Sequence, residues 1–136
     1  MLWPDLSRLL RRTKIALKRQ PDRFLAEIRG VIHVGANTGQ ERDLYDRYGL
    51  SVLWVEPIPE IFATLRENIA GYRRQRAVQY LVTDRDGAEY TFHVASNNGA
   101  SSSILDLKLH KEIWPEVSFT RELKLASVTL RTGARD

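Results

Sequence analysis

The chain of 136 residues contains no cysteine. Within these residues there is therefore no disulfide framework, no thiolate zinc site and no cysteine nucleophile, and no other metal site is expected. Long apolar runs are also missing, because none approaches the roughly 20 residues that a membrane-spanning helix needs. Arginines interrupt the N-terminal stretch, which lacks the apolar centre of a signal peptide. We therefore expect a cytoplasmic protein with no integral membrane segment.

The positive charge lies at the amino end. The net charge is +4, yet residues 1–30 carry eight Lys/Arg and three acids (+5), and the remainder carries 13 against 14 (−1). Residues 5–19 predict a basic amphipathic helix that either rests on anionic lipid or a phosphate-bearing substrate, or packs on the domain with a solvated basic face. We favour the second interpretation. The basicity belongs to this segment and does not indicate a nucleic-acid binder.

The remaining chain is typical of one globular domain. Hydrophobic residues make up 43% and charged residues 28% of the sequence, which is ordinary for such a domain. We therefore divide the chain into a basic helical segment, 1–29, and a domain, 30–136. A second short helix is expected over Asp22–Ile28, with Gly30 as its C-terminal stop.

The stretch that organises the domain is residues 31–41. Val31–Val34 is a short apolar, β-branched run typical of a buried parallel strand. The turn Gly35-Ala36-Asn37-Thr38-Gly39 follows, and a helix is predicted over 40–48. Glycine lets the backbone approach a ligand closely, and a helix start offers free N–H groups. The pattern predicts a cradle for a nucleotide-type ligand.

A second signal follows one strand later. Strand 52–55 ends in Glu56, 21 residues after Gly35. In such an architecture an acidic side chain at the end of the second strand accepts the ribose hydroxyls of a bound nucleoside. A helix is expected to follow, beginning at Pro59 or Glu60 and ending near Gly71.

The later elements complete the prediction. A third parallel strand is expected over 78–82, and alternation over 88–95 predicts a half-exposed antiparallel strand. Asp86-Gly87 is suited to a hairpin turn into that strand. A last strand over 122–130 would pair with strand 88–95 or with strand three.

Four motifs occur in an order that resembles FkbM-type methyltransferases, from about residue 30 to about residue 130. They are residues 31–41, Trp54-Val55-Glu56-Pro57, Val82-Thr83-Asp84-Arg85-Asp86-Gly87 and Asn98-Gly99-Ala100-Ser101-Ser102-Ser103. The resemblance implies a class I, Rossmann-like α/β fold, with S-adenosylmethionine as cofactor. The implied reaction is O-methylation of a hydroxyl on a saccharide or small-molecule acceptor.

The resemblance also implies a set of site residues. Gly35, Ala36, Asn37 and Gly39 would line S-adenosylmethionine, Glu56 would hold its ribose, and Thr83 or Asp84 would lie by the adenine. Asp84 is equally suited to forming a turn, because Asp-Arg-Asp-Gly is turn chemistry in its own right. The loop 98–103 resembles a family loop near the active site, and a plain polar connection explains it equally well.

The chain departs from the family pattern at two places. His33 stands where many relatives carry an acid that meets the cofactor's cationic amine, and a strand histidine is more often a core residue than a catalytic base. His93 and His110 are weaker candidates still, so no catalytic base is assigned. The sequence also stops at Arg-Thr-Gly-Ala-Arg-Asp, where relatives continue into another parallel strand and helix.

That second departure leaves strand 31–34 at an edge of the sheet. A second chain would cover this edge, or the final strand would occupy it, or the chain would be poorly soluble; we expect a homodimer. Two other functions stay open. One is a catalytically inactive methyltransferase fold. The other is a dinucleotide-binding module, although its fingerprint wants glycine where this chain has Asn37 and Gln40.

Overall fold

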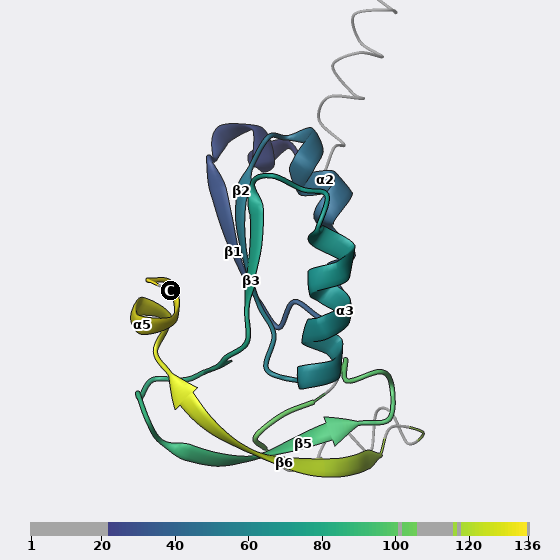
Figure 1. Cartoon of the computed structure of the whole chain (residues 1–136), viewed down its shortest axis with the longest axis vertical. Helices are drawn as coiled ribbons and strands as arrows, with labels where there is room; N and C mark the ends of the chain where they lie inside the picture. The colour runs from purple at the N-terminus through teal and green to yellow at the C-terminus, as the bar shows by residue number, and fades with distance from the viewer. Residues whose placement is uncertain (1–21, 101, 106–115, 117, 136) are drawn as a thin grey trace, which may run out of the picture.

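The computed structural model describes residues 22–100, 102–105, 116 and 118–135, and it contains two three-stranded sheets. The first is parallel, in the order β1 (Gly30–Val34), β2 (Ser51–Val55), β3 (Gln75–Val78). The second has the order β4 (Leu81–Val82), β6 (Phe119–Val128), β5 (Glu89–Ala95). It lies across the lower end of the first sheet in Figure 1. The architecture is mixed α/β.

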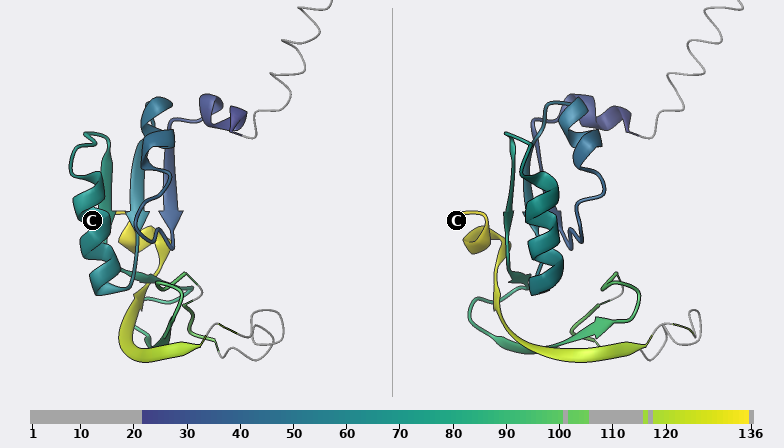
Figure 2. Two further views of the ribbon diagram at one scale, coloured as in Figure 1. Left: turned by 90° about the vertical axis from the view of Figure 1, so that its right-hand side faces the viewer. Right: turned by 45° about the vertical axis from the view of Figure 1, so that its right-hand side comes forward.

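The helices cover the two faces of the first sheet unequally. The 3₁₀ helix η1 (Arg23–Glu27) precedes β1, α2 (Arg42–Arg47) follows it, and α3 (Pro59–Ile69) follows β2. Helices α2 and α3 lie on one side of the sheet, whereas the four-residue helix α5 (Leu130–Gly133) lies on the other side (Figures 1 and 2). Within the described ranges, no helix combines the length and apolar character that a bilayer crossing requires.

The main core lies between the parallel sheet and α3. Trp54 at 0% exposure and Val52 at 3% project from β2 towards the helix side, where they meet Leu65 and Ile69. These two α3 residues lie four apart and therefore share one face of that helix. Pro59 occupies the first position of α3, where its missing N–H costs no hydrogen bond.

The first half of the prediction is largely confirmed. Strands 31–34 and 52–55 match β1 and β2 to within one residue, and both predicted helices are present. The role given to Gly30 was wrong, because η1 ends before Ile28 and Gly30 begins β1. A Cβ at Gly30 would lie 2.9 Å from the carbonyl oxygen of Ser51, so glycine permits the close pairing of β1 with β2.

The predicted third strand over 78–82 was wrong. β3 ends at Val78, and after Gln79 and Tyr80 the chain crosses into the second sheet as β4. β3 also begins earlier than predicted, at the buried polar residue Gln75, whose side-chain Oε1 accepts the indole N–H of Trp54 at 3.1 Å. This long-range hydrogen bond keeps a polar side chain inside the sheet, which an apolar pattern does not anticipate.

The antiparallel part is confirmed with corrections. β5 pairs with β6 as expected, and β6 also pairs with β4. Leu130 belongs to α5 and not to the last strand, because the Thr129 hydroxyl caps α5 by accepting the Thr132 N–H at 3.3 Å. The Asp86-Gly87 turn does not join neighbouring strands, since β6 lies between β4 and β5. Gly87 instead donates its N–H to Ser127 of β6 at 2.7 Å.

β1 is an edge strand of the described parallel sheet, as predicted. It is not a buried strand, however, because Ile32 and Val34 are 48% and 50% exposed. The alternative in which the final strand covers this edge was wrong, since β6 pairs with β4 and β5. The predicted helix over 5–19 and His110 lie outside the described residues.

Candidate functional site

The candidate site is built around the loop between β1 and α2. This loop requires residues that tolerate positive φ: Gly35 has φ 73°, Asn37 has φ 48° and Gly39 has φ 73°. Glycine adopts this region without strain, and asparagine is among the residues most often found there. Glycine is required at position 39 for a second reason, because a Cβ there would lie 2.8 Å from Cδ1 of Leu65 in α3. The loop therefore packs directly on the helix that follows β2.

Glu56 fixes this loop to the end of β2. The residue is 4% exposed. Its Oε2 accepts the backbone N–H of Asn37 at 2.8 Å, and its Oε1 accepts that of Ile58 at 3.0 Å. Burial raises the pKa of Glu56 above its ordinary value of 4.5, while the two backbone donors act in the opposite direction. The carboxylate thus joins the two consecutive βα connections.

Side-chain amides hold the loop from other directions. Asn37 accepts the Thr38 N–H on Oδ1 at 2.8 Å and donates from Nδ2 to the Asn98 carbonyl at 3.2 Å. Asn68 of α3 donates from Nδ2 to the Thr38 carbonyl at 2.8 Å. These contacts connect the loop to α3 and to the segment that follows β5.

The backbone N–H groups of the loop are already used inside the chain. Gly35 and Ala36 both donate to Val55 O, at 2.9 and 3.0 Å, and Gly39 donates to Ala36 O at 3.0 Å. Asn37 and Thr38 donate to the side chains described above. The N–H groups of the turn itself are therefore not free for a ligand, whereas the prediction that the start of the following helix offers free N–H groups stays a prediction. Residues 35–39 can therefore contact a ligand through their carbonyl oxygens and their side chains.

A cavity of about 620 Å³ adjoins the loop. It lies between the loop, the first turns of α3, the end of β5 with the segment after it, and β6. Its lining is mostly uncharged: Asn37, Thr38, Gln40, Ile58, Glu60, Ile61, Thr64, Val94, Ala95, Ser96, Asn97, Asn98, Gly99, Ala100, Thr120 and Arg121. The two charged lining residues, Glu60 and Arg121, form an ion pair with each other. The cavity therefore presents mainly amides, hydroxyls and apolar groups.

The structure brings together some of the predicted site residues but not all. The loop 35–39 and Glu56 are in direct contact, whereas Thr83 and Asp84 lie beyond β4 and do not line the cavity. Thr83 donates its N–H to Val128 of β6 at 3.0 Å, and its hydroxyl accepts the Arg85 N–H at 3.2 Å. The Asp84 side chain is 82% exposed. Both residues form a turn in this structure.

His33 lies in an aromatic cluster on the helix side of β1. Its ring stacks on Trp54 with centroids 5.0 Å apart, and its Nδ1 lies 3.1 Å from the Tyr45 hydroxyl. Oε2 of Glu41 is 4.0 Å from the same nitrogen and is buried without a hydrogen-bond partner among the described residues. Burial and the Glu41 charge raise the pKa of Tyr45. His33 does not line the cavity.

Sequence reasoning missed the residues that position the loop from a distance. Asn68 is 30 residues from its partner Thr38, and Asn98 is 61 residues from Asn37. Asn98 belongs to a motif of the resemblance, so that motif gave a signal for it. No local pattern distinguishes Asn68 from any other polar residue on a helix.

Comparisons with protein-family models, curated proteins and solved structures gave no match to this chain. No group of three or more His, Asp or Glu side chains within the described ranges could hold a metal ion. The loop, Glu56 and the adjoining cavity are therefore the features of the described residues that bear on function.

The buried carboxyl of Glu56 predicts a measurable pH dependence of stability. Because its pKa is raised on folding, the folded state binds more protons than the unfolded state in the window that opens near pH 4.5 and extends up to the raised pKa. The free energy of unfolding is therefore expected to fall as pH rises through this window. Glu56→Gln should remove this part of the dependence. Urea unfolding from pH 4 to 8 measures it, and identical profiles for both proteins would contradict the prediction.

Proposed function

We propose that the chain binds S-adenosylmethionine over the Gly35–Gly39 loop, in a domain of the O-methyltransferase kind. The observation that carries the proposal is the hydrogen bond from the Asn37 N–H to Glu56. It joins a positive-φ loop after the first parallel strand to the acid that ends the second. An ideal Cβ at Gly35 has no heavy atom within 4 Å, so the space over the loop at that residue is open.

The hydrogen bonds of the loop favour this cofactor over a dinucleotide. A pyrophosphate is an acceptor and is normally held by free backbone N–H groups at such a turn. Here the N–H groups of residues 35–39 all have acceptors within the chain. S-adenosylmethionine instead presents a cationic amine and ribose hydroxyls, and these groups can donate hydrogen bonds to carbonyl and carboxylate oxygens.

Glu56 has a positioning role that precedes any contact with ribose. A carboxylate offers about four acceptor sites, and two of them are used by Asn37 and Ile58. The other two are available to ribose hydroxyls only if the region around Glu56 opens, because the residue is 4% exposed. Under the proposal, cofactor binding therefore includes a local rearrangement at the end of β2.

The adjoining cavity is suited to a neutral acceptor that carries hydroxyl groups. Its volume of about 620 Å³ is in the range of small-molecule sites, and it is lined mainly by amides, hydroxyls and apolar side chains. A saccharide or a small hydroxylated metabolite has matching donors and acceptors. Methyl transfer would require the acceptor oxygen to be held in line with the sulfonium methyl group.

A second function, cofactor binding without catalysis, is favoured by one observation. The only carboxylate or histidine among the described lining residues is Glu60, and Arg121 forms an ion pair with it. A hydroxyl that is not acidic reacts faster with a general base at hand. In this alternative the protein keeps the cradle and transfers no methyl group.

Calorimetric titration of the purified chain with S-adenosylhomocysteine, beside a parallel titration with NAD⁺, tests the proposal. We expect micromolar binding of S-adenosylhomocysteine and no heat with NAD⁺. If the folded protein does not bind S-adenosylhomocysteine, the cofactor assignment is wrong. Binding of NAD⁺ alone favours the dinucleotide module. Incubation with methyl-tritiated S-adenosylmethionine and a panel of saccharides then distinguishes an enzyme from a protein that only binds the cofactor.

A further inference from the structure

One face of the parallel sheet is left partly uncovered by the described elements. On the helix side of the sheet, Trp54 and Ala77 are cross-strand partners, and Val31 of β1 faces the same side. All three belong to the main core. Because side chains alternate along a strand, the next residues point to the other side. On that side lie two cross-strand rows: Ile32, Leu53 and Arg76, and Val34, Val55 and Val78.

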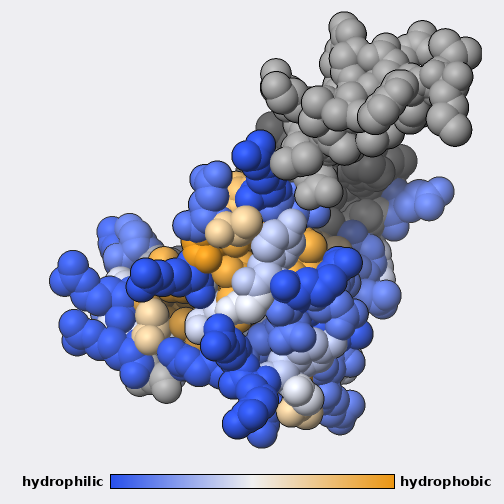
Figure 3. Space-filling model, turned by 90° about the horizontal axis from the view of Figure 1, so that it is seen from above, coloured by the Kyte–Doolittle hydropathy of each residue, from blue (hydrophilic) through white to orange (hydrophobic). Residues whose placement is uncertain are grey.

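The apolar side chains of this face are most exposed along β1. Leu53 and Val55 of the central strand are 7% and 2% exposed, whereas Ile32 and Val34 are 48% and 50% exposed. Leu130, which begins α5 on the same side of the sheet, is 42% exposed. Figure 3, which looks down on the molecule from above, shows hydrophobic surface in the middle of the view with hydrophilic side chains around it.

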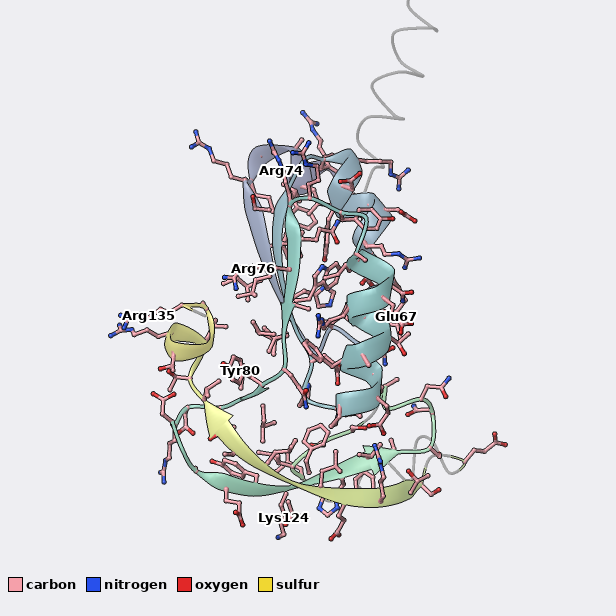
Figure 4. All side chains as sticks on the ribbon, in the orientation of Figure 1. Glu67, Arg74, Arg76, Tyr80, Lys124 and Arg135 are labelled. Carbon is pink, nitrogen blue, oxygen red and sulfur yellow. The ribbon has the colours of Figure 1, made fainter. Side chains whose placement is uncertain are left out.

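The border of this face is basic. Arg76 is exposed and donates from Nη2 to the Ala134 carbonyl at 3.3 Å, which places the end of α5 beside the row that contains Ile32. Arg131 and Arg135 are also exposed in and after α5. Figure 4 shows Arg76 between β3 and α5, Arg135 beyond α5 and pointing away from the sheet, and Glu67 on the opposite side of the sheet, on α3. The nearby carboxylate of Asp86 accepts the Thr129 N–H at the start of α5.

We propose that this face, formed by Ile32, Val34 and Arg76 and bordered by α5 with the exposed residues Leu130, Arg131 and Arg135, binds an amphipathic helix of a partner protein with acidic residues beside its apolar stripe. Parallel sheets are normally covered by helices on both faces, so a helix is the element that completes this one. An apolar stripe would cover Ile32 and Val34, and glutamates or aspartates would meet the arginines.

Charge argues against two occupants from this chain, a second copy and the N-terminal segment. A second copy placed face to face would bring the same arginines opposite each other. Residues 1–21 carry six Lys/Arg and one acid, so they too would meet like charge. An acidic helix from a partner removes this repulsion. The inference is independent of the proposed cofactor site, which lies at the carboxyl ends of the strands.

The test uses the whole chain and two synthetic amphipathic peptides of about 20 residues, long enough to form helices. Both carry a leucine stripe, and they differ only in having glutamate or lysine beside it. Calorimetry is expected to show that the glutamate peptide binds roughly tenfold more tightly than the lysine peptide, with the difference shrinking in high salt. Amide chemical shifts of the wild type should change in β1 and α5 when the glutamate peptide is added.

Variants assign the binding to this face. Ile32→Ser with Val34→Ser should weaken binding of the glutamate peptide roughly tenfold, and Arg76→Glu should reduce the preference for the glutamate peptide, because Arg131 and Arg135 remain. Leu105→Ser, at a residue 70% exposed and outside the face, and Arg66→Glu on α3 are the matched controls and should bind as the wild type does. Equal binding of both peptides would overturn the proposal, as would shifts confined to other elements. A wild-type dimer that the double variant dissociates would assign the face to a second copy instead.

Discussion

Trp54→Ala is expected to lower the free energy of unfolding by about 3–5 kcal/mol, the usual cost of removing a large buried aromatic side chain. Trp54 is 0% exposed and packs between the sheet and the helices. Its ring contacts His33 and Tyr45, with centroids 5.0 and 5.3 Å away. Since a domain of this size is stable by only about 5–15 kcal/mol, the variant should lose a large part of its stability.

The matched control is Trp54→Phe. Phenylalanine keeps an aromatic ring in the cluster but removes the N–H that Gln75 accepts at 3.1 Å. A buried acceptor without a partner costs about 1–3 kcal/mol, so this variant should lie between the wild type and Trp54→Ala. Urea unfolding followed by far-ultraviolet circular dichroism measures all three proteins. A loss below about 1 kcal/mol for Trp54→Ala would show that the cluster contributes little.

The parallel part of the fold was predictable because its signals are local. Val31–Val34 and Val52–Val55 are short apolar runs, each followed by a turn and a helix, and consecutive units of this kind form a parallel sheet. β3 and β4 were predicted as one strand because the sequence gives no local sign that the chain changes sheets at Gln79 and Tyr80. The position of Gln75 depends on a hydrogen bond to a residue 21 positions away.

The candidate site was also predictable only where its signals are local. The contact between the Gly35–Gly39 loop and Glu56 follows from two adjacent strand ends, which the sequence does indicate. The sequence does not predict that the Glu56 carboxylate accepts two backbone N–H groups of its own chain, because this depends on the φ of Asn37 and on the N–H of Ile58. The adenine role expected of Asp84 assumed a third strand in the first sheet, and β4 belongs to the second sheet.

Gly35→Ala is expected to weaken binding of S-adenosylhomocysteine by roughly tenfold or more. An alanine methyl at this position would project into the open space over the loop, where the proposed cofactor lies. Forcing a methyl group into a filled site costs about 1–3 kcal/mol, and about 1.4 kcal/mol corresponds to tenfold in affinity. The variant also carries backbone strain, because Gly35 has φ 73°. A control therefore has to reproduce the strain without the methyl group at the site.

Gly87→Ala is that control. Gly87 has φ 72°, and an ideal Cβ there also has no heavy atom within 4 Å, yet the residue lies in the turn between β4 and β5. Each variant should lose about 1–2 kcal/mol of stability, the cost of a left-handed conformation in a residue with a side chain. Calorimetric titration should then find wild-type affinity in Gly87→Ala and weakened binding in Gly35→Ala alone. Wild-type affinity in both variants would place the cofactor away from this loop, whereas an equal loss of affinity in both would assign the effect to backbone strain.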